Sequence, residues 1–138
     1  MLVNQSVKPT EIVLVEDGPV PYELSRMLLE YKDKYGEVMN VIKLEKNGGL
    51  GNALKIGVEN AKYDIIARMD SDDICLPDRF EKPLAYLEAN PECDIVGGQM
   101  TEFIDTPDNI VGRREVPLTN DEIYDYMKSR CALNHVTV

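Results

Sequence analysis

The stretch DIIARMDSDD, residues 64–73, decides the fold. Its first six residues have the apolar character of a buried strand, and three carboxylates follow at Asp70, Asp72 and Asp73. Carboxylates this close repel one another at neutral pH, and a hard divalent cation relieves the repulsion because it prefers oxygen ligands. A solvated turn would use the same residue types, but the position directly after an apolar strand favours a cation. We therefore predict a divalent-metal site at the end of this strand.

An EF-hand loop is the first alternative for the acidic cluster. Asp70, Asp72 and Glu81 fall at positions one, three and twelve of that pattern. Ile74 stands at position five, however, and Cys75 stands where the loop needs glycine. The cluster is therefore not an EF-hand. Arg68 and Arg79 bracket it, and we expect each to form a structural ion pair.

Strand and helix signals alternate from residue 11 to residue 98, which predicts an α/β fold with three α/β/α layers and a mostly parallel sheet. A hairpin and a last helix, which a capping box at residues 119–122 introduces, follow. The expected strands are residues 11–15, 38–44, 64–69 and 94–97, the hairpin is 99–104 with 110–116, and the helices are 22–35, 50–61, one near 80–87 and 120–130.

Both acidic clusters, Glu16–Asp17 and Asp70 to Asp73, lie where parallel strands end, at the edge where such sheets bind ligands. Glu16 and Asp17 follow the strand at residues 11–15, and either carboxylate could accept hydrogen bonds from a base or a ribose. Residues 47–52 (NGGLGN) precede a helix and could approach a phosphate closely. This segment lacks the endings of a P-loop and of the dinucleotide fingerprint, so by itself it favours a plain tight turn over a phosphate site.

Composition excludes several classes of function. The formal net charge of −10 argues against a nucleic-acid partner. The single histidine, His135, excludes a His-rich zinc site. The three cysteines have no CxxC spacing, which indicates reduced thiols in a cytoplasmic protein. No apolar run reaches the roughly 20 residues of a membrane span.

Four motifs together resemble the inverting family 2 glycosyltransferases of the GT-A fold. They are EIVLVEDGP (residues 11–19), NGGLGNALKIGVENAKYDIIARMDSDD (47–73), LPDRFEK (76–82) and NHVTV (134–138). They occur in the family's order, and the resemblance runs from about residue 4 to residue 138. It implies a domain of the nucleotide-diphospho-sugar transferase type.

The resemblance also implies roles for single residues. Glu16 and Asp17 match the acidic pair that recognises the uracil base, and Gly49 lies in the glycine element beside the nucleotide. Asp70 matches the aspartate near the ribose, and Asp72 matches the aspartate of the DXD motif that holds Mn²⁺ or Mg²⁺ on the diphosphate, with Asp70 beside it as a second metal ligand.

The reaction implied by the resemblance is metal-assisted, inverting transfer of a sugar from a nucleotide-sugar donor, UDP-linked, to a hydroxyl of a carbohydrate or lipid-linked acceptor, as in polysaccharide biosynthesis. The family's first strand has no counterpart here, and its catalytic base would lie beyond residue 138. We therefore expect residues 1–138 to form one partial catalytic domain, inactive alone, with its nucleotide-sugar half at about 11–98 and the start of the acceptor side at about 99–138.

A missing strand would expose sheet backbone, so we expect self-association into homo-oligomers through that edge. The expected location is cytoplasmic, and membrane-peripheral for a full-length protein. Two other readings stay open at this point. One is a phosphorelay receiver-like domain, which LVEDG (residues 14–18) mimics, and the other is a catalytically inactive nucleotide-binding module.

Overall fold

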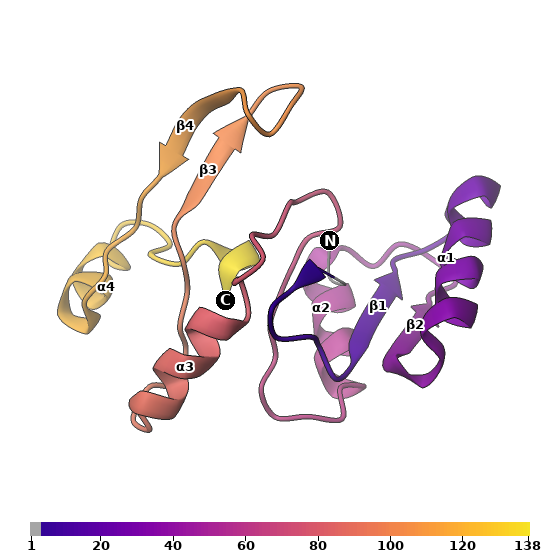
Figure 1. Cartoon of the computed structure of the whole chain (residues 1–138), viewed down its shortest axis with the longest axis horizontal. Coiled ribbons are helices and arrows are strands. Elements are labelled where there is room, and N and C mark those ends of the chain that lie inside the picture. Colours follow the sequence, from indigo (N-terminus) through magenta and orange to yellow (C-terminus); the bar gives the residue numbers. More distant parts are fainter. Residues whose placement is uncertain (1–3) are drawn as a thin grey trace. The chain divides into compact units, whose positions relative to one another are not determined.

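A computed structural model describes residues 4–138 of the chain (Figure 1). Residues 1–3, the start of the predicted domain, lie outside the described residues. The chain forms two compact units, one of residues 8–66 and one of residues 67–138 together with the N-terminal residues up to Val7. The assignment of residues 1–138 to one partial catalytic domain stays a prediction.

The unit of residues 8–66 is built on a parallel strand pair. Strand β1 (Ile12–Glu16) pairs with β2 (Met39–Lys43), in a register that runs from Ile12 opposite Met39 to Glu16 opposite Lys43. Helix α1 (Tyr22–Tyr35) makes the crossover between the strands, and α2 (Leu50–Glu59) follows β2. These four elements lie where the sequence predicts them, and both strands therefore end at the same edge.

The two helices cover opposite faces of this strand pair. Val15 of β1 lies on the α2 side, since a Cβ atom added at Gly57 would be 3.6 Å from it. The next residue, Glu16, lines a small hollow of about 40 Å³ with Leu28 of α1. Successive strand residues point to opposite faces, so the unit has the layer order helix, sheet, helix. This order agrees with the predicted three-layer arrangement.

Helix α1 ends where the sequence predicts. Gly36 has a φ of 58° and donates its backbone N–H to the carbonyl of Lys32. A left-handed φ is the conformation in which glycine avoids the steric cost of a side chain. A short 3₁₀ turn at Gly36–Val38 then leads directly into β2, whose first residue, Met39, is buried.

Two of the predicted strands are not strands in the structure. Residues 64–69 and 94–97 run as irregular chain (Figure 1), and the first of them crosses the boundary between the units. Ile65 and Ile95, which a buried strand would cover, are exposed. A strand forms only when a neighbouring strand pairs with its backbone groups, and among the described residues neither segment belongs to a sheet, although the N–H of Arg68 is donated to the carbonyl of Val138. Their apolar pattern is real, but the pairing predicted from it is wrong.

The second unit contains two helices and a hairpin. Helix α3 (Glu81–Ala89) carries Pro83 in its first turn, the position that a helix tolerates. Strands β3 (Met100–Phe103) and β4 (Ile110–Arg114) form the predicted antiparallel hairpin, and its loop holds Asp105 at a φ of 63°. Helix α4 runs from Asn120 to Tyr126, ending four residues before the predicted 130.

None of the helices in residues 4–138 is long and apolar enough to cross a membrane.

The capping box of α4 allows a test of local stability. Thr119 accepts the backbone N–H of Glu122 through its hydroxyl, while Glu122 reaches back to the N–H of Thr119. Thr119→Ala removes the acceptor, and we expect it to lower the free energy of unfolding by about 1 kcal/mol. Urea denaturation would measure the loss. Thr119→Ser keeps the hydroxyl and should stay close to the parent, so equal losses in both variants would contradict the capping role.

Candidate functional site

Asp17 joins the two loops that follow the paired strands. It lies just beyond β1, and its two carboxylate oxygens accept the backbone N–H groups of Gly48 at 2.7 Å and Gly49 at 2.9 Å. Both glycines lie between β2 and the start of α2. The acidic turn and the Gly-rich turn, which are 31 and 32 residues apart at these contacts, are therefore neighbours at the carboxyl edge of the strand pair.

Gly18 permits this close approach. Its φ is 97°, and a Cβ atom at this position would lie 2.7 Å from the backbone nitrogen of Asn47. Any side chain would therefore clash with backbone and would also occupy a left-handed conformation that is costly for it. Asp17 thus makes the contact with the Gly-rich turn, and Gly18 leaves the space that this contact needs.

Glu16 points the other way, beneath α1. Its side chain is 5% exposed, and one carboxylate oxygen lies 3.2 Å from the ammonium of Lys43 on β2. Strand alternation accounts for this orientation, since Glu16 and Lys43 are directly opposite in the register and share one face. Within this unit the carboxylate is thus an internal ion-pair partner.

These contacts show what the residues of the first unit do locally. The sequence suggests that the Gly-rich segment could approach a phosphate. In the structure, the N–H groups of Gly48 and Gly49 donate to Asp17 instead. The carboxylate shapes the turn that starts α2, where negative charge also favours the helix N-terminus. Roles for Glu16, Asp17 and Gly49 toward a nucleotide stay predictions.

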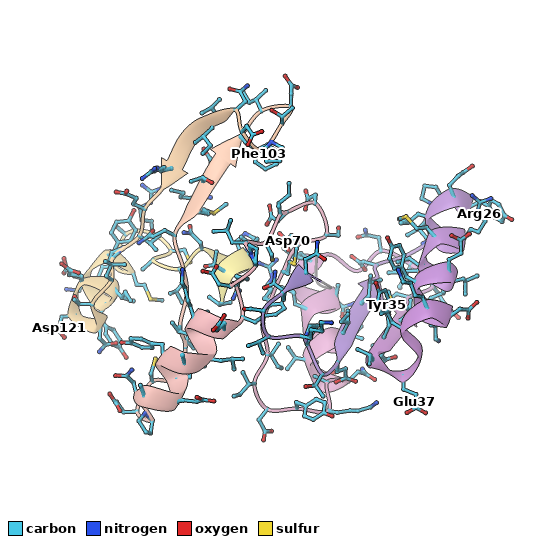
Figure 2. The ribbon with its side chains drawn as sticks, viewed as in Figure 1. Arg26, Tyr35, Glu37, Asp70, Phe103 and Asp121 are labelled. Carbon is cyan, nitrogen blue, oxygen red and sulfur yellow. The ribbon has the colours of Figure 1, made fainter. Side chains whose placement is uncertain are left out.

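The DXD segment lies in the second unit, where Arg68 contacts its first aspartate. Arg68 Nη2 donates to Asp70 Oδ1 at 2.8 Å, and Arg68 Nη1 contacts Nδ1 of His135 (Figure 2, where Asp70 is labelled). The Arg68 side chain is 12% exposed and that of Asp70 is 32% exposed. The ion pair predicted for Arg68 is therefore confirmed.

Arg79 has a different role from the one predicted. Its Nη2 donates to two backbone carbonyls, that of Arg68 at 3.3 Å and that of Val138 at 3.0 Å. Since Val138 also accepts the backbone N–H of Arg68 at 2.7 Å, the guanidinium of Arg79 ties the end of the described chain to the segment before Asp70. A long-range partner of this kind leaves no local sequence signal.

The acidic cluster carries charge that its surroundings do not fully offset. Burial raises the pKa of the Asp73 carboxyl, and repulsion from Asp72 and Asp70 raises it further, while Arg68 opposes the shift. Asp72 is exposed, and Asp73 is half-buried. The cluster is thus a patch of crowded carboxylates in which only Asp70 has an ion-pair partner among the described residues.

The carboxylate oxygens of this cluster are of the type that a hard cation binds, but they are too few to complete its coordination shell. In residues 4–138 no three His, Cys, Asp or Glu side chains converge on a point that could hold a metal ion. Hard cations of the Mg²⁺ and Ca²⁺ type take about six or more oxygen ligands. An ion held by Asp72, with or without Asp70, would therefore need oxygens from a ligand.

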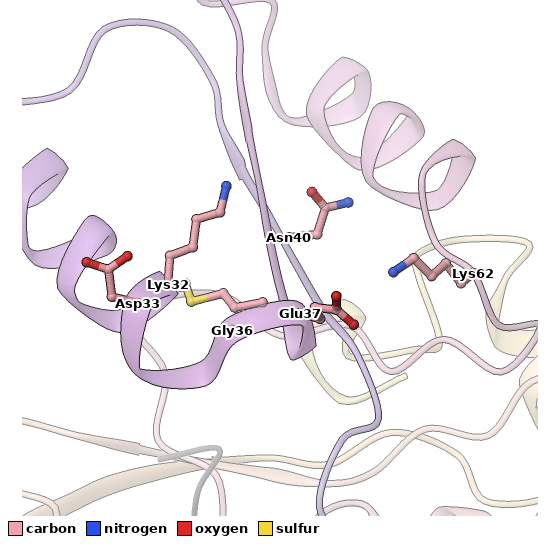
Figure 3. A pocket seen from close by; sticks show the side chains of 7 residues that line it. Lys32, Asp33, Gly36, Glu37, Asn40 and Lys62 are labelled. Carbon is pink, nitrogen blue, oxygen red and sulfur yellow. The ribbon is translucent and has the colours of Figure 1, made fainter.

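A separate hollow of about 710 Å³ lies in the first unit, at the end where the strands begin (Figure 3). It is open and polar, and it contains none of the residues that the sequence predicts for the site. Its lining comes from the end of α1, the start of β2 and the segment after α2, and includes Lys32, Asp33, Glu37, Asn40 and Lys62. Acidic and basic groups are mixed in this lining.

Comparison with known proteins decides the family. The family model for glycosyl transferase family 2 matches residues 1–137. The chain belongs to this family. The family has an α/β fold of the GT-A type, which agrees with the small parallel sheet and flanking helices of residues 8–66, and membership removes the receiver-domain reading. No solved structure matches the chain.

Several curated relatives are similar over almost the whole chain. An uncharacterised glycosyltransferase of Haemophilus influenzae is 44% identical over 99% of this chain and 51% of its own length. The amylovoran biosynthesis glycosyltransferase AmsE of Erwinia amylovora is 39% identical over 99% and 50%. The UDP-Gal:alpha-D-GlcNAc-diphosphoundecaprenol beta-1,3-galactosyltransferase of Escherichia coli is 33% identical over 99% and 49%. The chain thus spans about half the length of these relatives.

The Asp17 contact can be tested by removing one of its two acceptors. Asp17→Asn keeps a single side-chain oxygen, so one glycine N–H loses its partner. We expect the free energy of unfolding to fall by about 1–2 kcal/mol and the amides of Gly48 and Gly49 to exchange with solvent faster. Asp33→Asn, at an exposed carboxylate on α1, is the matched control and should change stability by less than about 0.5 kcal/mol. Unchanged exchange of both glycine amides in Asp17→Asn would contradict the contact.

Proposed function

We propose that this chain forms the donor-binding part of a glycosyltransferase that moves a sugar from a UDP-sugar to a hydroxyl of a lipid-linked or polysaccharide acceptor, with inversion. The observation that carries the proposal is the cluster of Asp70, Asp72 and Asp73, in which one carboxylate is held by Arg68 and the others remain crowded and unneutralised. Family membership supplies the reaction type. The Escherichia coli relative, by its name a UDP-Gal-dependent enzyme with an acceptor on diphosphoundecaprenol, supports the donor and the lipid carrier.

Asp72 and Asp70 have different roles in this proposal. Asp72 is exposed and has no ion-pair partner among the described residues, so it is the first choice as ligand for a divalent ion. Asp70 already gives Oδ1 to Arg68, which makes it a weaker metal ligand and leaves Oδ2 to accept a hydrogen bond from a ribose hydroxyl. A bound Mn²⁺ or Mg²⁺ supplies Lewis-acid stabilisation of the diphosphate leaving group.

The remaining features of the proposal follow from the family and the relatives. A base on the enzyme removes the proton of the acceptor hydroxyl, and none of the described residues is assigned this role. A lipid-linked acceptor would bring the complete protein to a membrane surface. The inactive nucleotide-binding module is the competing proposal, and a transfer assay with UDP-sugar and a lipid diphosphate acceptor on a longer chain separates the two.

Metal-dependent nucleotide binding is the first test of the proposal. UDP with Mn²⁺ should raise the melting temperature of the wild-type chain by several degrees, since a ligand at about 100 times its dissociation constant stabilises by about 2.7 kcal/mol. UDP alone should shift it much less, because the diphosphate would then meet the carboxylates without a cation between them. Differential scanning fluorimetry measures both shifts.

Asp72→Asn is the decisive variant for this test. Loss of the carboxylate should remove most of the shift with UDP and Mn²⁺ while leaving the melting temperature of the free chain within a few degrees of the parent. Asp121→Asn, at an exposed carboxylate in the first turn of α4 in the same unit (labelled in Figure 2), should retain the full shift. A shift of equal size without metal, or in Asp72→Asn, would count against the proposal.

A further inference from the structure

The guanidinium of Arg68 bridges His135 and Asp70. One arm, Nη2, donates to Asp70 Oδ1 at 2.8 Å, and the other, Nη1, contacts His135 Nδ1. The Nε atom of Arg68 is buried and has no hydrogen-bond partner among the described residues. Two contacts therefore orient the fork, and loss of either would let it pivot about the other.

The chemistry of the two side chains decides which of them donates. A guanidinium has only donors, so in this contact Nδ1 of His135 is the acceptor. His135 Nδ1 also lies 4.0 Å from Asp70 Oδ2. Oδ2 accepts no hydrogen bond from the described residues, while Oδ1 is taken by Arg68.

The backbone around His135 is anchored firmly enough to serve as a support. Asn134 is buried, and its side chain donates to the carbonyls of Gly98 at 3.0 Å and Arg114 at 3.3 Å. The hydroxyl of Thr137 accepts the N–H of Gly98 at 2.9 Å. Together with the Val138 contacts of Arg68 and Arg79, these bonds hold residues 134–138 against the segment that leads to Asp70.

We propose that His135 is a positioning residue for the nucleotide site and acts through Arg68. By holding Nη1, it keeps Nη2 on Asp70 Oδ1 and so presents Oδ2 of Asp70 to the ligand. The inference rests on the proposed function, since it takes Asp70 as a nucleotide contact. It gives the NHVTV segment (residues 134–138) a role that its sequence alone does not indicate.

The test compares three substitutions at His135 by calorimetric titration of UDP in the presence of Mn²⁺. His135→Ala removes the acceptor, and we expect binding to weaken about threefold to tenfold, the size of one hydrogen bond. His135→Asn should restore most of the affinity, because its Oδ1 is an acceptor at the same distance along the side chain as Nδ1. His135→Leu fills space without an acceptor and should behave as the alanine variant does.

A second measurement keeps the inference separate from the proposed function. The ¹⁵N relaxation of Arg68 Nε reports the mobility of the guanidinium without any ligand. It should show an ordered group in the wild type and in His135→Asn, and a mobile one in His135→Ala and His135→Leu. If wild type fails to bind UDP with Mn²⁺, the proposed function and the inference that rests on it fall, and Arg68 relaxation then shows only whether His135 holds the guanidinium.

Two results would overturn the inference while leaving the proposed function in place. One is wild-type affinity in His135→Ala with Asp72→Asn still defective. The other is equal loss of affinity in the alanine and asparagine variants at an unchanged melting temperature, since an acceptor at this position would then be irrelevant.

Discussion

Two acidic side chains that follow apolar segments are held by hydrogen-bond donors, from a turn 31 and 32 residues away for Asp17 and from the nearby Arg68 for Asp70. Asp17 receives two backbone N–H groups from the turn before α2, and Asp70 receives a guanidinium that His135 contacts in turn. A carboxylate removed from water without donors is expensive, so these contacts decide which acidic groups can be partly buried. Asp72, which has no such donor among the described residues, is exposed.

In the second unit, the positively charged side chains of Arg68 and Arg79 are partly buried, although the chain has a net charge of −10. Arg79 donates to the carbonyls of Arg68 and Val138, and burial lowers the pKa of its guanidinium. Removing one residue of such a partly buried set destabilises the folded protein by more than the whole set stabilises it, because the remaining charged and polar groups are left unpaired. The geometry around Asp70 is therefore a property of the whole set.

Sequence reasoning succeeded where the signal is local. Gly36 ends α1, Thr119 and Glu122 begin α4, and the alternation in residues 11–43 produces the parallel pair β1 and β2. It failed for residues 64–69 and 94–97, because an apolar run states what a strand would bury but does not supply the neighbour that would pair with it. Tertiary pairing is decided by the rest of the fold.

The site residues divide in the same way. The two acidic clusters at residues 16–17 and 70–73 were predicted to share one edge, and because they lie in different units this stays a prediction. The contact between Asp17 and Gly49, which joins the acidic and Gly-rich turns of the first unit, was not predicted. The inward orientation of Glu16 follows from strand alternation, but its position opposite Lys43 depends on the strand register, which only the structure shows. The roles of Arg79 and Asn134 could not have been predicted, because their partners are backbone carbonyls in distant parts of the sequence. The separations are 11 and 59 residues for Arg79, and 20 and 36 residues for Asn134.

The contacts of Val138 have a consequence for the order in which the protein matures on the ribosome. Residues 8–66 form a compact unit of consecutive residues, so all of its members have been synthesised once residue 66 has been added. Asp70 is different, because Arg68, which holds it, contacts His135 and Val138, and both are synthesised 65 or more residues later than Asp70 itself. On a nascent chain, residues 70–73 therefore emerge well before the groups that orient Arg68 have been made.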